Sequence, residues 1–522
     1  MSAGFADSDN RAAMPAGGIS LSDLVQSALA ASPAADEAGF GLGRFLAEPS
    51  PGEALLRWFG GTIPKSKEQV ARQLSHDIAW LDEAISRQVN AVLHHRRFQR
   101  LEASWRGLQY LVQQQVEDRG IKIRVLSVSW KELARDIDQA IEFDQSQLFR
   151  KVYTAEFGMP GGEPFGVLLG DYEIWPGPCT EHPVDDLKVL EGISGVAAAA
   201  FAPFVAGVHP AMFGLSDFSG FQQHVDLAPV FEQVEYLTWQ AFRKKPDSRF
   251  IALTLPRVLM RLPYEDDGSR VDGFCFREDV TGPNRDAGGL TGDIGGPDKY
   301  LWGNASYAFG AVLMRSYARS GWFADIRGVR RDLEGGGVAT GLPVHWFSTD
   351  RSGVAAKCST DVIVTDDREP ELSDLGFIPL CHCADTEYSA FYATSSVQKP
   401  KRYDDPRSTM NARISAMLQY TMCVSVFAHY VKVIVRDKIG AFTGAGQCQD
   451  YLNEWLTQYV TRDADASTEV KAARPLREAE AEVRPVPGEE GHYSCTVRLW
   501  PHFELDELAS MLQLKTLLKG PT

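Results

Sequence analysis

The stretch PFGVLLGDY, at residues 164–172, is apolar over most of its length, which is typical of a buried β-strand. An apolar stretch at residues 187–208, the strand-like RFIALTLP at residues 249–256 and an apolar helix at residues 301–317 continue an alternation of helices and strands. Such alternation predicts a core of the α/β class, in which helices pack on a sheet.

The residues before this core predict helices. Between residues 67 and 118 apolar side chains recur at helical spacing, which indicates a helical entry region. One face carries Val70, Leu74, Ile78 and Leu81, and another carries Leu101, Trp105, Leu108 and Leu111 or Val112. Over residues 121–125 the apolar period falls to two, which predicts a strand. We therefore expect a mixed α+β fold within the α/β class, with a helical N-terminal part.

The first 66 residues read as a flexible leader with a short amphipathic helix at about residues 20–31. Ser20 and Asp23 form a capping box at its start. Its apolar side chains include Leu21, Leu24, Val25 and Leu29. Small and polar residues follow, so the helix is loosely tethered and free to bind another protein. Docking on its own domain is an equally good interpretation.

The end of the chain combines helices with strands. Residues 407–442 predict one long helix, and a shorter helix is expected near residues 451–460. A charged stretch, 466–482, then precedes a strand with true alternation and an apolar tail at residues 511–518. The alternating residues of that strand are Tyr493, Cys495, Val497 and Leu499. The expected parts are a leader (1–66), a helical entry with an α/β core (67–400) that carries a Gly- and Asp-rich surface insertion (263–297), and a C-terminal domain (401–522).

Charge and composition disfavour some classes of function. Asp and Glu outnumber Lys and Arg by 69 to 53, and the net charge of −16 repels phosphate backbones and anionic lipid headgroups. The sequence does not open on a secretory signal, and its longest stretch of small apolar residues, 193–208, is too short and interrupted to span a bilayer. The eight cysteines are scattered, as is typical of reduced, buried thiols. We expect no nucleic acid partner, no membrane insertion and a cytoplasmic location.

No strong catalytic signature occurs in the sequence. A phosphate loop, a G-x-S-x-G nucleophile elbow and an H-E-x-x-H zinc helix are all absent. The glycine-rich run 288–296 lacks a Lys-Ser/Thr ending, and Cys381, His382 and Cys383 lack a second Cys/His pair at zinc-ribbon spacing. His94 and His95 lie in a cation-rich helical stretch with no nucleophile in view. We expect no catalytic, cofactor-binding or metal-binding residues, and a soluble α/β enzyme remains the alternative.

Several long stretches resemble the large contractile-sheath subunit of bacterial type VI secretion systems, the TssC/VipB (EvpB-like) family. They are FQRLEASWRGLQYLV (98–112), FDQSQLFRKVYTAEFGMPGGEPFGVLLGDYE (143–173), YLWGNASYAFG (300–310), KCSTDVIVTD (357–366), LGFIPLCHCADTEYSAFYATSSVQKPKRYDD (375–405), FAHYVKVIVRDKIG (427–440) and PHFELDEL (501–508). Runs of this length are far more specific than a short motif, and they cover the chain from about residue 67 onward.

Two of these runs form the signature helices of the resemblance. Their signature residues are Leu101, Trp105, Leu108, Phe427, Tyr430 and Lys432. One position departs from the family pattern, because Val426 stands where an Arg usually precedes FAHY. Any ion pair that this Arg makes is therefore lost here.

The resemblance implies a multi-domain structural subunit rather than an enzyme. It implies pairing with a smaller sheath protein, TssB/VipA, and stacking with neighbouring copies around an Hcp inner tube, anchored to a baseplate. Contraction of this sheath drives the tube into a target cell. The resemblance also implies recycling by a ClpV-type ATPase, which engages a sheath helix exposed after contraction. The leader helix with Leu21, Leu24, Val25 and Leu29 is the candidate for that helix.

An open helical filament needs contacts that do not close on themselves, and a terminal strand supplies them by joining a sheet of another subunit. We therefore expect the strand with Tyr493, Cys495, Val497 and Leu499, together with the apolar tail, to join a sheet shared with neighbouring subunits. The alternative is that it completes the sheet of its own domain. A homopolymeric sheath of the phage-tail type, built without a small partner, is the alternative assembly.

Overall fold

The computed structural model describes most of the chain after residue 44. The described residues are 45–64, 66–116, 120–159, 161–222, 226–265, 273–280, 299–329, 335–348, 355–383, 386–438, 445–463, 466–485, 493–502 and 512–518. They form two compact units, the first ending at Arg87 and the second beginning at Gln88. The leader helix expected at residues 20–31 lies outside the described residues, as does most of the insertion expected at residues 263–297.

The first unit contains helix α3 (Pro51–Trp58) and the beginning of the long helix α4 (Lys67–Leu93). Nε1 of Trp58 donates a hydrogen bond of 2.9 Å to Asp77 on α4, and the Trp58 ring lies 5.3 Å from that of Phe45. No side chain of α3 or α4 is fully buried. A helix is stabilised mainly by burying its apolar stripe, so these two helices carry apolar surface that the described residues do not fully cover.

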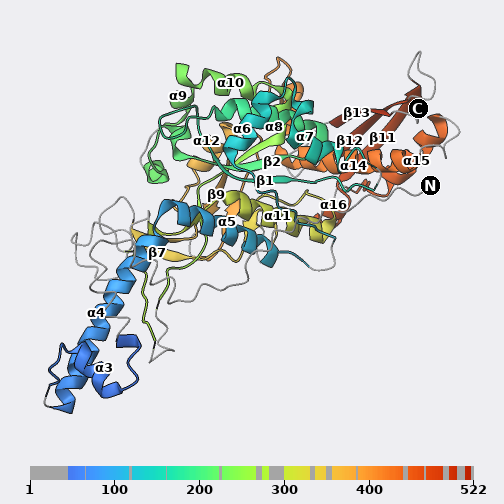
Figure 1. Ribbon diagram of the computed structural model, residues 1–522. Coiled ribbons are helices and arrows are strands. Elements are labelled where there is room, and N and C mark those ends of the chain that lie inside the picture. The colour runs from blue at the N-terminus through green and yellow to red at the C-terminus, as the bar shows by residue number, and fades with distance from the viewer. Residues whose placement is uncertain are drawn as a thin grey trace, which may run out of the picture. The chain divides into compact units, whose positions relative to one another are not determined.

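Helices and strands alternate along the second unit (Figure 1). The helices are α5 (Arg96–Gln113), α6 (Trp130–Gln139), α7 (Gln147–Phe149), α8 (Asp186–Ala200), α9 (Ala228–Phe231), α10 (Leu237–Arg243), α11 (Ala305–Ser320), α12 (Arg368–Asp374), α13 (Pro406–Ser415), α14 (Leu418–Lys438), α15 (Ala445–Thr457) and α16 (Thr468–Ala473). A π-helical turn, η2 (Arg150–Thr154), follows α7. The strands are β1 (Leu168–Ile174), β2 (Phe204–Val208), β3 (Ile251–Leu255), β4 (Val258–Leu259), β5 (Trp302–Gly303), β6 (Val338–Ala339), β7 (His345–Ser348), β8 (Ala355–Cys358), β9 (Ile378–His382), β10 (Ser389–Phe391), β11 (Leu476–Pro485), β12 (Tyr493–Pro501) and β13 (Leu512–Leu518).

The centre of the second unit is a six-stranded sheet with strand order β1-β2-β3-β9-β10-β6. Strands β1, β2, β3 and β9 run parallel, whereas β10 runs antiparallel to both β9 and β6. Every residue of β2 and β3 is buried, as expected for parallel strands with helices on both faces. The strands predicted at residues 164–172 and 249–256 are β1 and β3, and the mixed α/β fold class is confirmed.

Each face of this sheet has its own core, because successive residues of a strand point to opposite faces. Val205 on β2 belongs to a cluster with residues of α5, α11 and α14, whereas its neighbours Phe204 and Ala206 belong to a cluster with residues of α8 and α10. The first cluster also contains buried residues of β11 and β12. The central sheet and the C-terminal strands therefore share one continuous core.

Helix α5 packs closely on α11 because Gly107 has no side chain. A Cβ atom at Gly107 would lie 2.4 Å from the ring of Tyr307 on α11. Ala103, Tyr110 and Leu111 are buried on the same face of α5. The contact between the two helices thus depends on small residues at its centre.

The prediction of a single long helix at residues 407–442 is wrong, because the chain forms two helices there, α13 and α14. Met417, between the two helices, makes an isolated β-bridge with Ser395. The amide of Ser396 also donates to the carbonyl oxygen of Ala416 at 3.1 Å. Pairing with another segment therefore interrupts the helical hydrogen bonds at this point.

Two other segments also differ from their expectation. Residues 121–125 form no strand, and Lys122 and Arg124 in this stretch make ion pairs with Glu163 instead. The charged stretch 466–482, for which no strand is expected, contains α16 and most of β11. In the second segment, pairing with β12, which lies farther along the chain, gives β11 its extended conformation.

Burial of the cysteines follows the expectation in part. Five are buried, Cys383 is intermediate, and Cys179 and Cys275 are exposed.

Helix α14 is long and apolar enough over Leu418–Val435 to cross a membrane by length and composition, but 67% of this window is buried inside the protein. Such burial is typical of a core helix.

A buried ion network ties α5 to the residues that follow β4. Arg261 donates hydrogen bonds to Glu102 on α5 (2.7 Å) and to Glu278 (3.1 Å), and His94 lies 3.2 Å from Glu278. The side chains of Arg261 and Glu278 are only 7% and 1% exposed. Burial opposes ionisation of Glu278, but hydrogen bonds from His94 and Arg261 outweigh it and lower the pKa of this carboxyl to about 2.

Glu278→Gln is expected to lower the free energy of unfolding at pH 7 by about 3 kcal/mol, because it leaves the buried Arg261 with one carboxylate fewer. The folded pKa of Glu278 lies below its unfolded value of about 4.3. The stabilisation from this carboxylate is therefore present above the unfolded pKa and is lost as the pH falls toward 2. Urea unfolding at a series of pH values should show the two proteins converging over that window.

The exposed Glu265 provides the control. Glu265→Gln should leave both the stability and its pH dependence unchanged. An equal and constant difference between wild type and Glu278→Gln from pH 7 to pH 2.5 would contradict an ionised, paired Glu278.

Candidate assembly surfaces

The last three strands form an antiparallel sheet in the order β11-β12-β13. Val497 on β12 pairs with Ala481 of β11 on one side and with Leu514 of β13 on the other. Cys495, Val497 and Leu499 are buried in the shared core. A slip of one residue would turn these side chains out of the core, so burial fixes the register of β12. The strand predicted from Tyr493 to Leu499 is thus the central strand of this sheet.

Helix α15 closes the outer edge of β11. The side chain of Asn453 accepts a hydrogen bond from the N–H of Ala481 (2.8 Å) and donates one to its carbonyl oxygen (3.1 Å). Gln449, one turn earlier, accepts from the N–H of Val483 (3.0 Å). A side-chain amide offers the same donor and acceptor as a peptide group. These two residues therefore take the place of a further strand.

The outer edge of β13 pairs with no other strand within the described part of the chain. The backbone N–H and C=O of Ala481 bind Asn453 and therefore point away from β12. Across the strand pair, the N–H and C=O of Val497 then point toward β13, where Val497 and Leu514 form a hydrogen-bonded pair. By the same alternation, the backbone groups that point to the outer edge belong to Gln513, Lys515 and Leu517. The sheet has one closed edge and one edge whose amides face outward.

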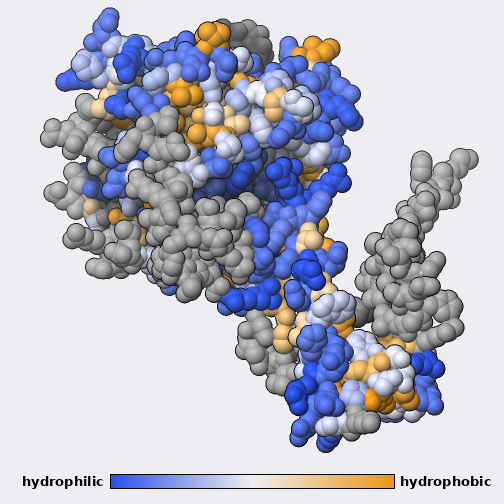
Figure 2. All heavy atoms as spheres, turned by 90° about the vertical axis from the view of Figure 1, so that its left-hand side faces the viewer, coloured by the Kyte–Doolittle hydropathy of each residue, from blue (hydrophilic) through white to orange (hydrophobic). Residues whose placement is uncertain are grey.

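Exposed hydrophobic side chains stand out because the surface is mostly hydrophilic, as the face in Figure 2 shows. Leu101 and Trp105 are 57% and 65% exposed on α5, and Leu108 is half-buried beside them. The sequence grouped these three residues on one helical face, and the structure has that face. It points away from the core, which the face with Gly107 contacts instead.

The signature residues of α14 lie partly in the core. Phe427 is fully buried and stacks on Trp322, with ring centroids 4.3 Å apart. Tyr430 is 41% exposed and lies 5.9 Å from the ring of Trp455. Val426 is buried in the same apolar cluster, so this chain fills with a hydrophobic side chain the position at which the resemblance expects an Arg.

Lys432 fastens α14 to the helices beside it. Its ammonium group lies 3.9 Å from the ring centroid of Phe157, with Tyr153 at 5.3 Å and Phe201 at 5.7 Å. Burial lowers the pKa of Lys432 to about 8. The electron-rich faces of the rings stabilise the ammonium group, so this signature residue holds the chain together rather than facing outward.

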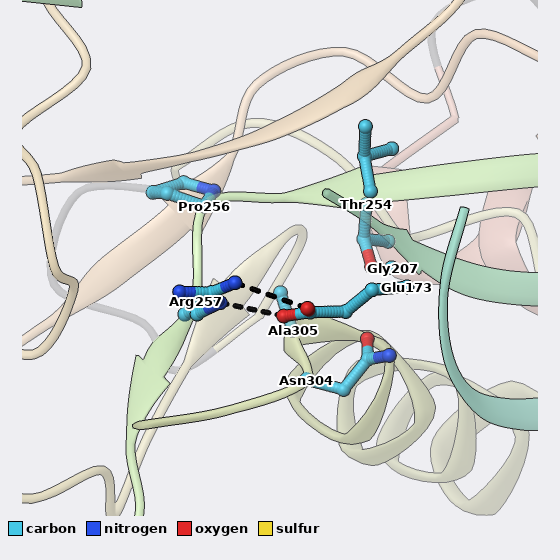
Figure 3. A pocket seen from close by; sticks show the side chains of 8 residues that line it. Glu173, Gly207, Thr254, Pro256, Arg257, Asn304 and Ala305 are labelled. Atoms are coloured by element: carbon cyan, nitrogen blue, oxygen red, sulfur yellow. Dashed lines mark hydrogen bonds and ion pairs between the residues drawn. The ribbon is translucent and has the colours of Figure 1, made fainter. Parts of the chain in front are cut away.

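The carboxyl ends of the parallel strands, where open α/β sheets bind ligands, hold an ion pair. Arg257 donates to Glu173 through Nε (2.5 Å) and Nη2 (3.0 Å), as Figure 3 shows. Asn304, beside them, is bound to the carbonyl oxygen of Tyr172 (2.8 Å) and to the amide of Ser306 (2.9 Å). The hollow between them has a volume of about 10 Å³, which is room for about one water molecule and not for a small-molecule ligand.

The titratable groups near this hollow are also engaged. Asp361 accepts a hydrogen bond from the amide of Arg257 (3.1 Å), and burial raises the pKa of its carboxyl to about 7. On β9, which does not line this hollow, burial raises the pKa of the Cys381 thiol to about 12. Within the ranges that the structure describes, no group of three or more His, Cys, Asp or Glu residues could hold a metal ion. His95 caps α5 by accepting from the amide of Arg97 (3.3 Å).

Comparisons with known proteins identify the family. Residues 75–398 match the VipB family, described as "EvpB/VC_A0108, tail sheath N-terminal domain", and residues 407–518 match VipB_2, its "tail sheath gpW/gp25-like domain". A curated relative from Pseudomonas aeruginosa, "Type VI secretion system sheath protein TssC1", is 40% identical over 440 residues, which is 84% of each chain.

Among solved structures, a chain of the cryo-EM structure of the anti-feeding prophage baseplate is similar over 72% of this chain and 73% of that chain, with 11% identity and a TM-score of 0.31. The two family matches and the curated relative define a structural sheath protein. The chain belongs to the EvpB/VipB tail sheath family, the large sheath subunits of type VI secretion systems.

Asn453→Ala combined with Gln449→Ala should expose the amides of Ala481 and Val483. A buried group without its partner costs about 1–3 kcal/mol, so hydrogen exchange in the segment 476–485 is expected to speed up by about tenfold or more, as measured by mass spectrometry. Asp450→Ala, an exposed position on the same helix, is the control and should leave exchange unchanged. Equal protection in the double variant would rule out closure of this edge by α15.

Proposed function

We propose that this chain is the large subunit of a contractile sheath that co-assembles with a small TssB/VipA-type subunit and with copies of itself in the bacterial cytoplasm. The sheath surrounds an Hcp tube, stands on a baseplate and contracts to propel the tube into a target cell. The observation that carries the proposal beyond family membership is the C-terminal sheet, in which α15 closes one edge and β13 occupies the other.

Strand addition suits a helical assembly for a physical reason. An edge strand offers a row of unpaired N–H and C=O groups, which bind a strand of another chain by main-chain hydrogen bonds. Such a contact is heterologous, so it can repeat along a filament without closing. The strand with Tyr493, Cys495, Val497 and Leu499 contributes as the centre of the shared sheet, and the added strand lies beside β13.

The proposed work is mechanical and needs no catalytic residue, cofactor or metal. A sheath that assembles in a metastable form gains contact free energy when its subunits move to the contracted arrangement. A gain of about 1–3 kcal/mol per subunit, typical of coupled conformational states, accumulates over many copies. The fully buried parallel strands and the paired charges at their carboxyl ends favour a subunit that moves as a rigid body.

Co-expression with the small sheath subunit of the same system tests this proposal. Negative-stain electron microscopy is expected to show hollow cylinders from the pair and none from the large chain alone. Cylinders formed by the large chain alone would support the homopolymeric alternative. A monodisperse monomer that never assembles with the small subunit would contradict the proposal.

Lys515→Pro tests strand addition at β13. Proline lacks the amide donor, and residue 515 directs that donor to the outer edge of the sheet, so the pairing of β13 with β12 should survive. We expect the variant to bind the small subunit but to form few cylinders, or only short ones, in electron micrographs. Lys515→Ala keeps the donor and should assemble as wild type does. Cylinders of normal length from the proline variant would place the shared strand elsewhere.

We further propose that the leader helix at residues 20–31 is the segment engaged by a ClpV-type ATPase after contraction. Deleting residues 1–32 should abolish capture of contracted sheaths by the ATPase and leave assembly intact. Substituting Leu24 and Leu29 by Ser keeps the full length of the chain and should also weaken capture by the ATPase. Unchanged capture of sheaths built from the deletion variant would remove this role.

A further inference from the structure

Helix α5 carries an apolar seam that the chain does not use for its own core. The seam residues follow one another at intervals of three, four, three and four: Phe98, Leu101, Trp105, Leu108 and Val112. Phe98 is 36%, Leu101 57%, Trp105 65% and Val112 53% exposed. The opposite face of the helix, with Ala103, Gly107 and Leu111, is buried toward α11. The helix thus has one satisfied apolar face and one unsatisfied apolar face.

The spacing of the seam specifies the shape of what covers it. Alternate intervals of three and four keep side chains in line along a helix and fit the holes of a second helix that packs nearly parallel or antiparallel to it. A strand, with its period of two, would not match this line. Burying apolar surface contributes about 25 cal/mol per Å² to the free energy of binding, so covering a large side chain such as Trp105 would stabilise the complex strongly. The seam therefore fits another amphipathic helix.

The charges beside the seam specify the chemistry of that helix. Arg96, Arg97 and Arg100 are exposed at the start of α5, and no salt bridge is found for them among the described residues. The first turn of α5 has no acidic residue, although the N-terminal end of a helix favours negative charge and disfavours arginines. An acidic side chain from another chain would relieve this local repulsion.

A second copy of α5 is a poor occupant, because the one acidic residue of α5, Glu102, already pairs with Arg106 and Arg261. Parallel packing of two α5 helices would also bring their N-terminal arginines together. The chain as a whole carries a net charge of −16, so a basic patch here is a local exception to its own surface. An acidic helix of a different polypeptide satisfies both the apolar spacing and the charge.

We propose that the α5 seam, Phe98 to Val112, is the docking site for an acidic amphipathic helix of the small sheath subunit. This assignment rests on the proposed function for the existence of that partner. The seam supplies the apolar contact, with Trp105 at its centre. Arg97 and Arg100, which lie along one side of the seam near the start of α5, select an acidic partner and speed the encounter.

The test compares variants of the full chain that differ only on exposed positions. Leu101→Ser with Trp105→Ser removes the centre of the seam, and Val125→Ser with Val234→Ser removes two apolar side chains that are 69% and 79% exposed elsewhere. Binding of the purified small subunit is measured by biolayer interferometry, and thermal unfolding checks that each variant folds. We expect binding to weaken about 30-fold or more for the seam variant and to stay within about twofold for the control.

The charge part of the proposal has its own readout. Arg97→Glu with Arg100→Glu should slow association about tenfold at low salt, because attraction to the acidic helix becomes repulsion, and added salt should then raise the rate of association where it lowers that of the wild type. Arg97→Lys with Arg100→Lys keeps the charge and should associate at nearly the wild-type rate. Equal rates for the glutamate and lysine variants would contradict an acidic partner.

The outcomes separate this inference from the proposed function. If the wild-type chain builds cylinders with the small subunit and the seam variant binds that subunit equally well, the seam is not the docking site and the function stands. If the wild-type chain does not bind the small subunit, the proposed function itself fails. If the chain dimerises alone through the seam, as gel filtration of the seam variant would reveal by loss of the dimer, the occupant is a second copy and the proposal is wrong.

Discussion

Backbone hydrogen bonding in the C-terminal sheet is the constraint on which the rest of the structure depends. Buried N–H and C=O groups must find partners, and a sheet edge left open invites another chain. This chain satisfies one edge with two side-chain amides, Asn453 and Gln449. The other edge is formed by β13, and in the described part of the chain no further strand pairs with it. A sheet that can grow in one direction only is what a directional assembly requires.

The central sheet supports this arrangement by being rigid. Its parallel strands are covered on both faces, and helix α14 belongs to the core that joins the central sheet to β11 and β12. The ion pair between Arg257 and Glu173 fills the place where a related topology would bind a substrate. Lys432 holds α14 to the segments with Phe157 and Phe201, and the ion network around Arg261 holds α5 to the residues that follow β4. In these contacts charged side chains hold structural elements together, which favours a subunit stiff enough to transmit force.

Much of the fold follows from local sequence. The strands β1 and β3 and the helix α11 were predictable because each is a continuous apolar run with clear ends. Strand β11 was not, because LREAEAEVRP consists mainly of residues that favour helices. Its conformation comes from pairing with β12 and from the contacts of Ala481 and Val483 with α15, which connect residues far apart in the sequence.

The candidate surfaces show the same division. The helical face with Leu101, Trp105 and Leu108 was visible in the sequence, but periodicity does not tell which of two apolar faces meets the core. Gly107 was the informative residue, since only the smallest side chain admits Tyr307 at that point. Likewise, alternation predicted β12 and its apolar residues, whereas its central place in the sheet depends on β11 and β13 together.

The shared sheet is most directly tested by a cryo-EM map of the assembled sheath in which single strands can be traced. The map should show a strand of another polypeptide hydrogen-bonded to the outer edge of β13, with Asn453 and Gln449 still bound to β11. An assembled sheath in which β13 has no neighbour, or in which a foreign strand displaces α15 from β11, would contradict it.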